Sequence, residues 1–282
     1  MNTITKKMSK QEIFALKERV ANQIQKESRP QYTFYQIKLR ECTITAYTSG
    51  KVVFQGKDLD WLAPDTPQQA DVYPQAGSDE VGTGDYFGPV VVSATIVEKD
   101  QVDVLRSMGI QDSKQINDEK IRQLAPRIKE LCPYTILVVS NDKYNQVHQT
   151  HNMVDIKCLL HNQAYVNLQQ KGYTLPNFLI IDQFVQKSSY YRYLQNQPKV
   201  IPDIHFETKA ENKYLSVACG SILARNAFLE AWDAMEAKYH FHFEKGAGKQ
   251  VDLCAQRFVD EFGKSELGHV AKLHFANTKK LK

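Results

Sequence analysis

The segment 89–97, PVVVSATIV, constrains the fold more than any other part of the chain. It is a near-continuous run of apolar and mostly β-branched residues, which predicts a strand buried on both faces. Helical patterns follow over 117–131 and 154–170, and a long helix is expected within 213–239. Further strands are expected over 134–140, 178–181 and 204–206. Strands that alternate with helices indicate an α/β fold in which helices cover a sheet.

The first seventy residues follow a different pattern. Apolar residues recur at helical spacing over 9–28, and Ser9 with Glu12 three residues later matches a capping box. Residues 32–54 are rich in threonine, tyrosine and isoleucine, as strands are. We therefore expect a small α+β domain over 1–62, with one helix against an antiparallel sheet.

A proline-containing segment separates this region from the rest of the chain. Residues 63–76 carry three prolines with little periodicity, so we interpret them as a linker. The second domain is then expected over 77–282.

Charge is distributed unevenly along the chain. The net charge is +4 over 1–70, −4 over 71–263 and +4 over 264–282. Basic ends suit a polyanion such as nucleic acid. On the first sheet, the side chains expected to be exposed could form an aromatic and basic platform for bases and phosphates: Tyr35, Lys38, Arg40, Tyr47 and Lys51. The alternatives are an ordinary solvated face and ordinary scatter of charge.

Two adjacent carboxylates open the second domain. Asp79 and Glu80 begin the run DEVGTGDYFGP, which is rich in glycine. The run fits neither a P-loop nor a dinucleotide-binding fingerprint. Hard divalent cations prefer oxygen ligands, and both carboxylates could reach one site at a strand end or a bulge. A surface turn built from Asp, Glu and Gly is the alternative.

Two later segments favour the metal interpretation. Asp182 directly follows four apolar residues at the end of an expected buried strand, and strand ends are where α/β sheets build ligand sites. Glu207, Glu211 and Lys213 then precede a helix whose first turns carry small residues.

These motifs, in this order, closely resemble those of the type 2 ribonucleases H. The family carries a D-E-x-G-x-G loop, a later Asp and a K-A-[DE] element before a small-residue helix, matched here by KAENKYLSVACGSILARNAFL. Thr83, Glu211, the N-terminal extension and the run KLHFANTKK resemble the ribonuclease HIII group in particular. The resemblance implies a ribonuclease H-like mixed sheet with flanking helices, preceded by a small α+β domain that is TBP-like.

The resemblance also implies a two-metal active site. Asp79, Glu80, Asp182 and Glu211 are its catalytic carboxylates, with two Mg²⁺ or Mn²⁺ ions about 3.5–4 Å apart when substrate is bound. Asp79 would bridge both ions, and Glu80 and Asp182 would each complete one ion's ligands. Glu211 is either a direct ligand or a residue that orients water.

The resemblance places the substrate near three further segments. The backbone of Gly82, Thr83 and Gly84 would face the RNA strand, where a 2′-hydroxyl distinguishes RNA from DNA. Ser113, Lys114 and Lys209 could contact phosphate, although Ser113 and Lys114 equally suit a turn and Lys209 could neutralise carboxylates. Structural or solvated roles are favoured for the remaining candidates: Asp85, Asp233, His269 and His274. Glu207 could replace Glu211 if the local register differs.

The predicted activity is endonucleolytic hydrolysis of the RNA strand of RNA–DNA hybrids, which leaves 5′-phosphate and 3′-hydroxyl ends. The alternatives are cleavage at single ribonucleotides in DNA, and a non-catalytic nucleic-acid-binding protein. Five scattered cysteines and no apolar signal segment favour the cytoplasm. We expect no membrane association, no obligate protein partner and a monomer.

Overall fold

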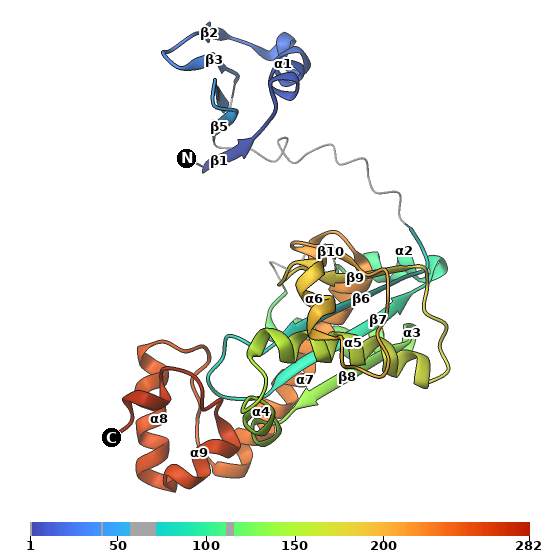
Figure 1. The fold of residues 1–282 in the computed structure, drawn as a ribbon, viewed down its shortest axis with the longest axis vertical. Helices are drawn as coiled ribbons and strands as arrows, with labels where there is room; N and C mark the ends of the chain where they lie inside the picture. Colours follow the sequence, from blue (N-terminus) through green and yellow to red (C-terminus); the bar gives the residue numbers. More distant parts are fainter. Residues whose placement is uncertain (1, 41, 57–71, 111–115) are drawn as a thin grey trace. The chain divides into compact units, whose positions relative to one another are not determined.

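The computed structural model describes residues 2–40, 42–56, 72–110 and 116–282, apart from the side chains of Asn2 and Ile4 (Figure 1). The chain forms two compact units, Met1–Asp71 and Val72–Lys282. Most of the expected linker, residues 63–71, lies outside the described residues. Its last two residues, Gln75 and Ala76, belong to the first strand of the second unit.

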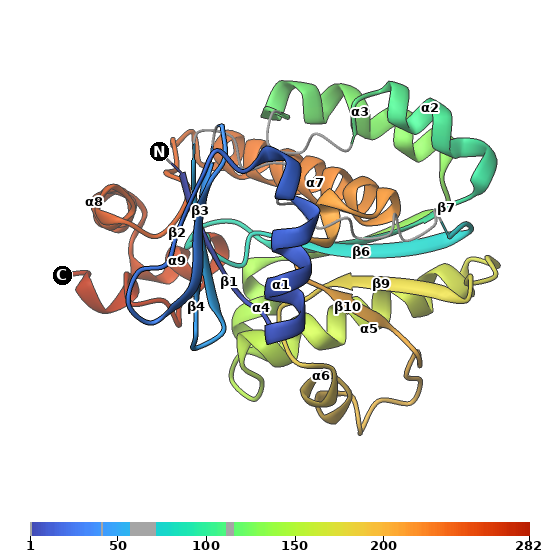
Figure 2. The ribbon, with the colours of Figure 1, turned by 90° about the horizontal axis from the view of Figure 1, so that it is seen from above.

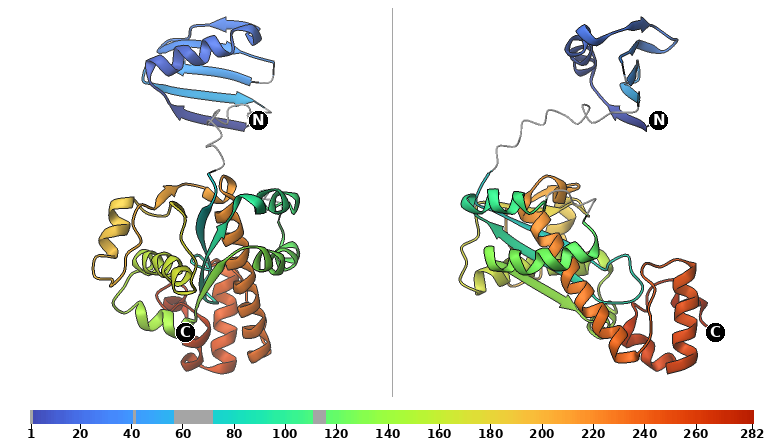
Figure 3. Two further views of the ribbon diagram at one scale, coloured as in Figure 1. Left: turned by 90° about the vertical axis from the view of Figure 1, so that its right-hand side faces the viewer. Right: turned by 180° about the vertical axis from the view of Figure 1, so that it is seen from behind.

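The N-terminal unit is a five-stranded antiparallel sheet with one long helix against it (Figure 3). The strand order is β1-β5-β4-β3-β2. The strands are β1 Asn2–Lys7, β2 Lys26–Ser28, β3 Thr33–Lys38, β4 Cys42–Tyr47 and β5 Lys51–Gly56. Helix α1, Lys10–Arg19, packs Ile13 and Leu16 into the core of this unit.

The predicted capping box of α1 is present, but the predicted helix is too long. The Ser9 hydroxyl accepts from the Glu12 amide at 3.3 Å, and the Glu12 carboxylate accepts from the Ser9 amide at 2.7 Å. The helix ends at Arg19, and the chain then forms a short 3₁₀ turn and strand β2. Pairing of β2 with β3 replaces the helical continuation, since tertiary pairing overrides a weak local preference.

One member of the predicted aromatic platform is wrong. Tyr35 is 1% exposed and faces α1, where its hydroxyl donates to the Ile13 carbonyl at 2.7 Å. Lys38 and Lys51 are exposed on the opposite face, which α1 does not cover. The strand alternation was therefore offset by one position at Tyr35.

The second unit is a mixed five-stranded sheet in the order β10-β9-β6-β7-β8. Its strands are β6 Gln75–Val81, β7 Val90–Val97, β8 Tyr134–Val139, β9 Phe178–Asp182 and β10 His205–Glu207. β9 pairs in parallel with β6 and β10, and the other neighbours are antiparallel. Every residue of β7 is buried, as its sequence predicts.

Helices cover both faces of this sheet (Figure 2). Helices α3, Asp118–Leu131, and α7, Leu215–Tyr239, lie on one face, and α5, Met153–Gln170, lies on the other. The other α-helices of the described part of this unit are α2 Val102–Ser107, α4 Asn141–Val147, α6 Lys187–Tyr193, α8 Lys249–Phe262 and α9 Lys264–Val270. No described helix is long and apolar enough to cross a membrane.

Helix α7 lies unusually close to strand β6. A Cβ atom added at Gly77 would lie 2.3 Å from the Val217 amide nitrogen and 2.6 Å from the Ser216 carbonyl carbon. No side chain fits in that space. Glycine on the strand and small residues on the helix therefore bring the first turns of α7 against the strand that carries Asp79 and Glu80.

A buried lysine near the C-terminus holds the loop between β6 and β7. Lys272 is fully buried, and its Nζ donates to the carbonyl oxygens of Asp85 at 2.8 Å and Gly88 at 2.6 Å. Burial lowers the pKa of Lys272 to about 7. Lys280 pairs with Asp252 at 2.7 Å. These two cations of the C-terminal basic run thus make contacts within the protein.

Candidate active site

Asp79 and Glu80 lie inside strand β6, and their side chains take opposite faces of the sheet. Side chains alternate along a strand, so neighbours point apart. Asp79 turns toward α7, where the Ser221 hydroxyl hydrogen-bonds to it. Glu80 turns toward α5, where it meets Lys157 and His161. Of the two expected arrangements, the bulge is wrong, because β6 pairs with β7 without a break as far as Val81. The pair does lie close to the end of the strand, since β6 ends at Val81 and its pairing with β9 stops at Ser78.

The surroundings of the Asp79 carboxyl group disfavour its negatively charged form. Burial raises its pKa to about 7, and the negative charges of Glu80 and Asp182 add to this effect. The hydrogen bonds from Ser221 and from the Glu80 amide act in the opposite direction. A divalent cation at this position would relieve the repulsion among the carboxylates.

Asp182 stands beside Asp79 on the neighbouring strand. The parallel register pairs Ser78 with Ile181, so the next residues along the two strands are Asp79 and Asp182. Asp182 ends β9, and its Oδ1 accepts from the Ala210 amide at 2.8 Å. The sequence thus predicted the position of Asp182 at a strand end, and the electrostatic effect on Asp79 shows that the two carboxylates interact.

The hydrogen bond between Ala210 and Asp182 also positions Glu211. Glu211 follows Ala210 in a 3₁₀ turn, Ala210–Asn212, and its Oε1 accepts from the Asn212 side chain at 2.9 Å. The competing residue Glu207 pairs with Asp182 across β10 and β9, but Lys213 and His205 neutralise it. The hydrogen bond from Lys213, with the charges of Lys213 and His205, lowers the pKa of Glu207 despite partial burial.

Both carboxylate oxygens of Glu80 have partners. Oε1 forms an ion pair with Lys157, and Oε2 lies 2.8 Å from Nε2 of His161. Although burial alone would raise it, the pKa of Glu80 is lowered because these two contacts outweigh burial. The sequence interpretation missed Lys157 and His161. Their spacing of four residues on an otherwise largely apolar helix, α5, was the available signal.

The carboxylates at this site supply some of the oxygen ligands that a hard divalent cation needs. Asp79 and Asp182 present carboxylates side by side with little compensating charge. Among the described residues, however, no three His, Cys, Asp or Glu side chains converge closely enough to form a ready-made metal site. Both carboxylate oxygens of Glu80 are already engaged by Lys157 and His161.

The expected substrate-contacting segments are only partly described. Gly82 has a φ of +90°, and a Cβ there would lie 2.2 Å from the Pro89 carbonyl oxygen. Gly84 is exposed and nothing lies within 4 Å of a Cβ built on it, so a ligand could approach its backbone. Thr83 between them is half-buried. Ser113 and Lys114 lie outside the described residues. Lys209 is exposed, with a left-handed φ of 55°.

The remaining candidates have structural partners. Asp85 accepts from the Gly246 amide at 2.6 Å, and Asp233 pairs with Arg122 at 2.8 Å. His269 lies 2.6 Å from Asp142. His274 stacks on His148, with ring centroids 4.1 Å apart, and burial and the nearby charges of His148 and Lys272 lower its pKa to about 4.

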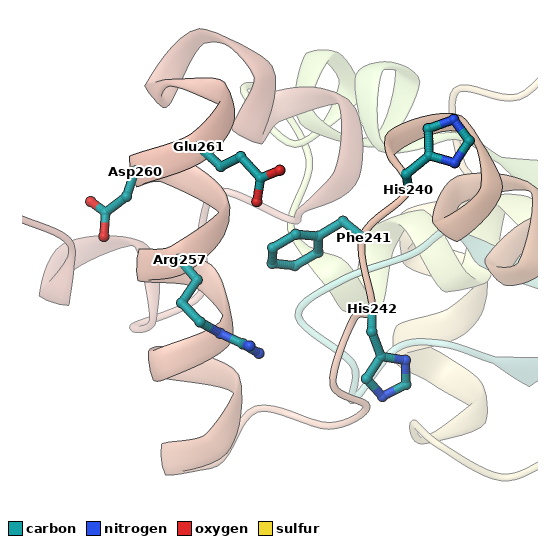
Figure 4. A pocket seen from close by; sticks show the side chains of 6 residues that line it. All are labelled: His240, Phe241, His242, Arg257, Asp260 and Glu261. Carbon is teal, nitrogen blue, oxygen red and sulfur yellow. The ribbon is translucent and has the colours of Figure 1, made fainter.

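A separate hollow lies between α8 and the segment after α7 (Figure 4). Its lining residues are His240, Phe241, His242, Arg257, Asp260 and Glu261. Acidic and basic side chains are mixed there, and Phe241 points across it toward α8 (Figure 4). None of the four predicted catalytic carboxylates lines it, so the hollow is distinct from the site on β6 and β9.

Comparison with known proteins covers both units. A family model described as Ribonuclease HII matches residues 76–278, and a domain of unknown function (DUF3378) matches residues 3–71. The chain is 40% identical over 276 residues to a protein of Bacillus cereus named Ribonuclease HIII, and 41% identical to one of Bacillus anthracis. Each alignment covers 89% of both chains.

Solved structures agree with this grouping. The crystal structure of Bst-RNase HIII in complex with Mn²⁺ matches with a TM-score of 0.73 and 35% identity, over 99% of this chain and 97% of that one. RNase H3 of Aquifex aeolicus, at 20% identity and a TM-score of 0.59 over 96% of this chain, shares the fold. Both matches extend through the N-terminal unit as well as the second one.

Proposed function

Because this chain belongs to the ribonuclease HII family and is similar over most of its length to proteins named ribonuclease HIII, we propose that Asp79, Glu80, Asp182 and Glu211 form its active site. The enzyme is a ribonuclease H, an endonuclease that hydrolyses the RNA strand of RNA–DNA hybrids. The observation that carries the assignment of residues is the pair Asp79 and Asp182. They lie side by side at neighbouring strands. Burial, with the negative charges of Glu80 and then Asp182, raises the pKa of Asp79 to about 7.

The proposed cofactor is a pair of divalent ions, Mg²⁺ or Mn²⁺. The related Bst-RNase HIII was crystallised with Mn²⁺, which supports dependence on a divalent metal. When bound, such ions activate water and stabilise the leaving 3′-oxygen. Asp79 would bridge the ions, Asp182 and Glu80 would each complete one set of ligands, and Glu211 would bind a metal ion or orient water.

This chain's own residues prepare the site for that chemistry. Ser221 and the Glu80 amide orient the carboxylate of Asp79. The Ala210 amide fixes Asp182, and Glu211 directly follows Ala210 in the chain. Attack of water on the phosphorus atom, with departure of the 3′-oxygen, would give products with 5′-phosphate and 3′-hydroxyl ends.

Recognition of the RNA strand is proposed for the loop after β6. The exposed backbone of Gly84, with Gly82 and Thr83, offers hydrogen-bonding groups that a 2′-hydroxyl could meet. Lys209, with the undescribed Ser113 and Lys114, is proposed to contact phosphate. The close approach of the Pro89 carbonyl to Gly82 fixes the path of this loop.

The N-terminal domain, 1–62, is proposed to bind the hybrid duplex, with 63–76 as the linker and 77–282 as the catalytic domain. The face of its sheet that α1 leaves open carries exposed lysines, including Lys38 and the paired residues Lys7 and Lys51. Lysines on an open sheet face suit contacts with phosphates. A monomeric, cytoplasmic enzyme is proposed, and its five buried, unpaired cysteines suit a reducing compartment.

One assay tests this function and its main alternative. The full chain is given a labelled RNA–DNA hybrid and, in parallel, a DNA duplex with one embedded ribonucleotide, with Mg²⁺ or Mn²⁺. We expect multiple cuts in the hybrid and much weaker cleavage of the single ribonucleotide. Efficient cleavage of the second substrate would instead assign ribonuclease HII-like specificity, and no cleavage of either would contradict the proposed site.

A further inference from the structure

A buried chain of hydrogen bonds links Ser78 of strand β6, through His161, to the carboxylate of Glu80. The Ser78 hydroxyl lies 2.7 Å from Nδ1 of His161, and Nε2 of His161 lies 2.8 Å from Oε2 of Glu80. Ser78 and His161 are both fully buried. An ionised carboxylate only accepts hydrogen bonds, so Nε2–H of His161 donates to Glu80 while Ser78 fixes the other ring nitrogen.

The second oxygen of Glu80 has a different kind of partner. Its Oε1 forms an ion pair with Lys157, one helical turn before His161 on α5. Phe184 supports both groups, since its ring stacks on His161 and the Lys157 ammonium lies 3.9 Å from its centroid. The side chain of Lys157 is 12% exposed, whereas that of His161 is 0% exposed. One contact is locked in the core, and the other borders solvent.

We propose that Glu80 is held by a permanent positioning contact from His161 and a replaceable counter-charge from Lys157, and that a divalent ion takes the place of Lys157. This inference rests on the proposed function, because it takes Glu80 to be a metal ligand. A metal ion that binds Oε1 of Glu80 must displace the ammonium group of Lys157 from that oxygen. The contact with His161 is made to the other oxygen, so it persists and keeps the carboxylate oriented.

The two contacts therefore predict opposite effects on metal affinity. Loss of the hydrogen bond from His161 frees the carboxylate to rotate, and loss of such supporting partners commonly costs about 10- to 100-fold in metal affinity. Loss of Lys157 removes a competitor, so the metal should bind more tightly. A residue with a purely structural role would not separate the two variants in this way.

The test measures binding of Mn²⁺ alone to the full chain, from the electron paramagnetic resonance signal of free Mn²⁺, at one fixed pH and without substrate. His161→Asn removes the donor at the Nε2 position, whereas His161→Gln can place an amide N–H there. We expect His161→Asn to weaken Mn²⁺ binding by about tenfold or more, and His161→Gln to restore most of the affinity. Lys157→Met should tighten binding several-fold, while the exposed control Lys99→Met should leave it unchanged.

Thermal unfolding of each variant identifies any that fail to fold, and His161→Gln keeps the test decisive if His161→Asn is unstable. Wild-type Mn²⁺ affinity in a folded His161→Asn would overturn the positioning contact. Weaker Mn²⁺ binding by Lys157→Met would overturn the proposal that the metal ion takes the place of Lys157.

Glu80→Gln separates failure of this inference from failure of the function. If Glu80→Gln loses Mn²⁺ affinity and the wild type cleaves hybrids, the proposed function stands whatever the His161 and Lys157 variants do. If Glu80→Gln binds Mn²⁺ as the wild type does, the metal-ligand role of Glu80 fails, and this inference fails with it.

Discussion

The two sheets of this protein differ in how much of their surface is covered by helices. The N-terminal sheet is covered by α1 on one face, and its other face presents side chains such as Lys38 and Lys51 to solvent. The sheet of the second unit has helices on both faces, so most of its side chains are buried. An open face can serve as a broad binding surface, whereas a covered sheet offers chemistry only near its strand ends. Asp79, Glu80 and Asp182 occupy such a position.

The largest expected effect is on hybrid cleavage, which is proposed to depend on carboxylates of the covered sheet. Asp79→Asn should reduce hybrid cleavage by about 10³-fold or more, because the residue that would join both ions loses its charge. Affinity for the hybrid should change little, since the open sheet is proposed to supply it. Single-turnover cleavage and filter binding measure the two quantities. Near-wild-type cleavage by Asp79→Asn would contradict the assignment.

A second expectation concerns packing in the covered unit. Gly77→Ala places a methyl group 2.3 Å from the Val217 amide nitrogen, so it should destabilise this unit by about 2–4 kcal/mol. Gly84→Ala, at a position where nothing lies within 4 Å, is the matched control for stability. Urea unfolding of the two variants makes the comparison. Equal stability would mean that α7 can move away from β6.

The pH dependence of stability provides a third expectation, for protein stripped of metal with a chelator. Burial raises the pKa of Asp79 from 3.8 to about 7, so between these values the folded state binds more protons than the unfolded state. Stability should therefore fall as pH rises from 4 to 7, by about 1–3 kcal/mol, and then level off. Asp79→Asn should lose this component, and saturating Mn²⁺ should reverse it. Urea unfolding at several pH values measures it, and an identical profile in Asp79→Asn would exclude Asp79 as the source.

The smallest expectation concerns the open sheet. Replacing Lys38 and Lys51 by Gln should weaken hybrid binding several-fold and lower the slope of log affinity against log salt by about one to two. The single-turnover rate at saturating substrate should stay near that of the wild type. Replacing Lys99 and Lys120, two exposed lysines of the second unit, instead controls for the loss of two charges. Equal slopes of log affinity against log salt for the two double variants would contradict a role of the open N-terminal face in binding the hybrid.

The sequence predicted much of the covered sheet, because its elements have strong patterns. β7 is apolar except at Ser93 and Thr95. Helices α3, α5 and α7 are long and start or end within two residues of the expected positions. Asp182 was predicted for the same reason, since a charged residue ending an apolar strand is conspicuous. The resemblance of motifs supplied the family, which the comparisons confirm.

Other features depend on contacts that the local sequence does not contain. β6 holds Gly, Ser, Asp and Glu, so it resembles a turn, and only its position between β7 and β9 makes it a strand. The partners of Glu80 lie about eighty residues further along, on α5. Tyr35 belongs to the buried face of β3 together with Thr33 and Ile37, and its aromatic, hydroxyl-bearing side chain gives no local sign of which face it takes.

The anchoring of the glycine loop by Lys272 has a consequence for synthesis of the chain. The carbonyls of Asp85 and Gly88 receive this partner from a residue made almost two hundred positions later. A ribosome delivers the chain from its N-terminus, and domains fold as units once their parts are available. The strands of the N-terminal sheet all precede residue 57, so this unit can fold early in translation. The loop between β6 and β7 gains its lysine partner only after residue 272 has been synthesised.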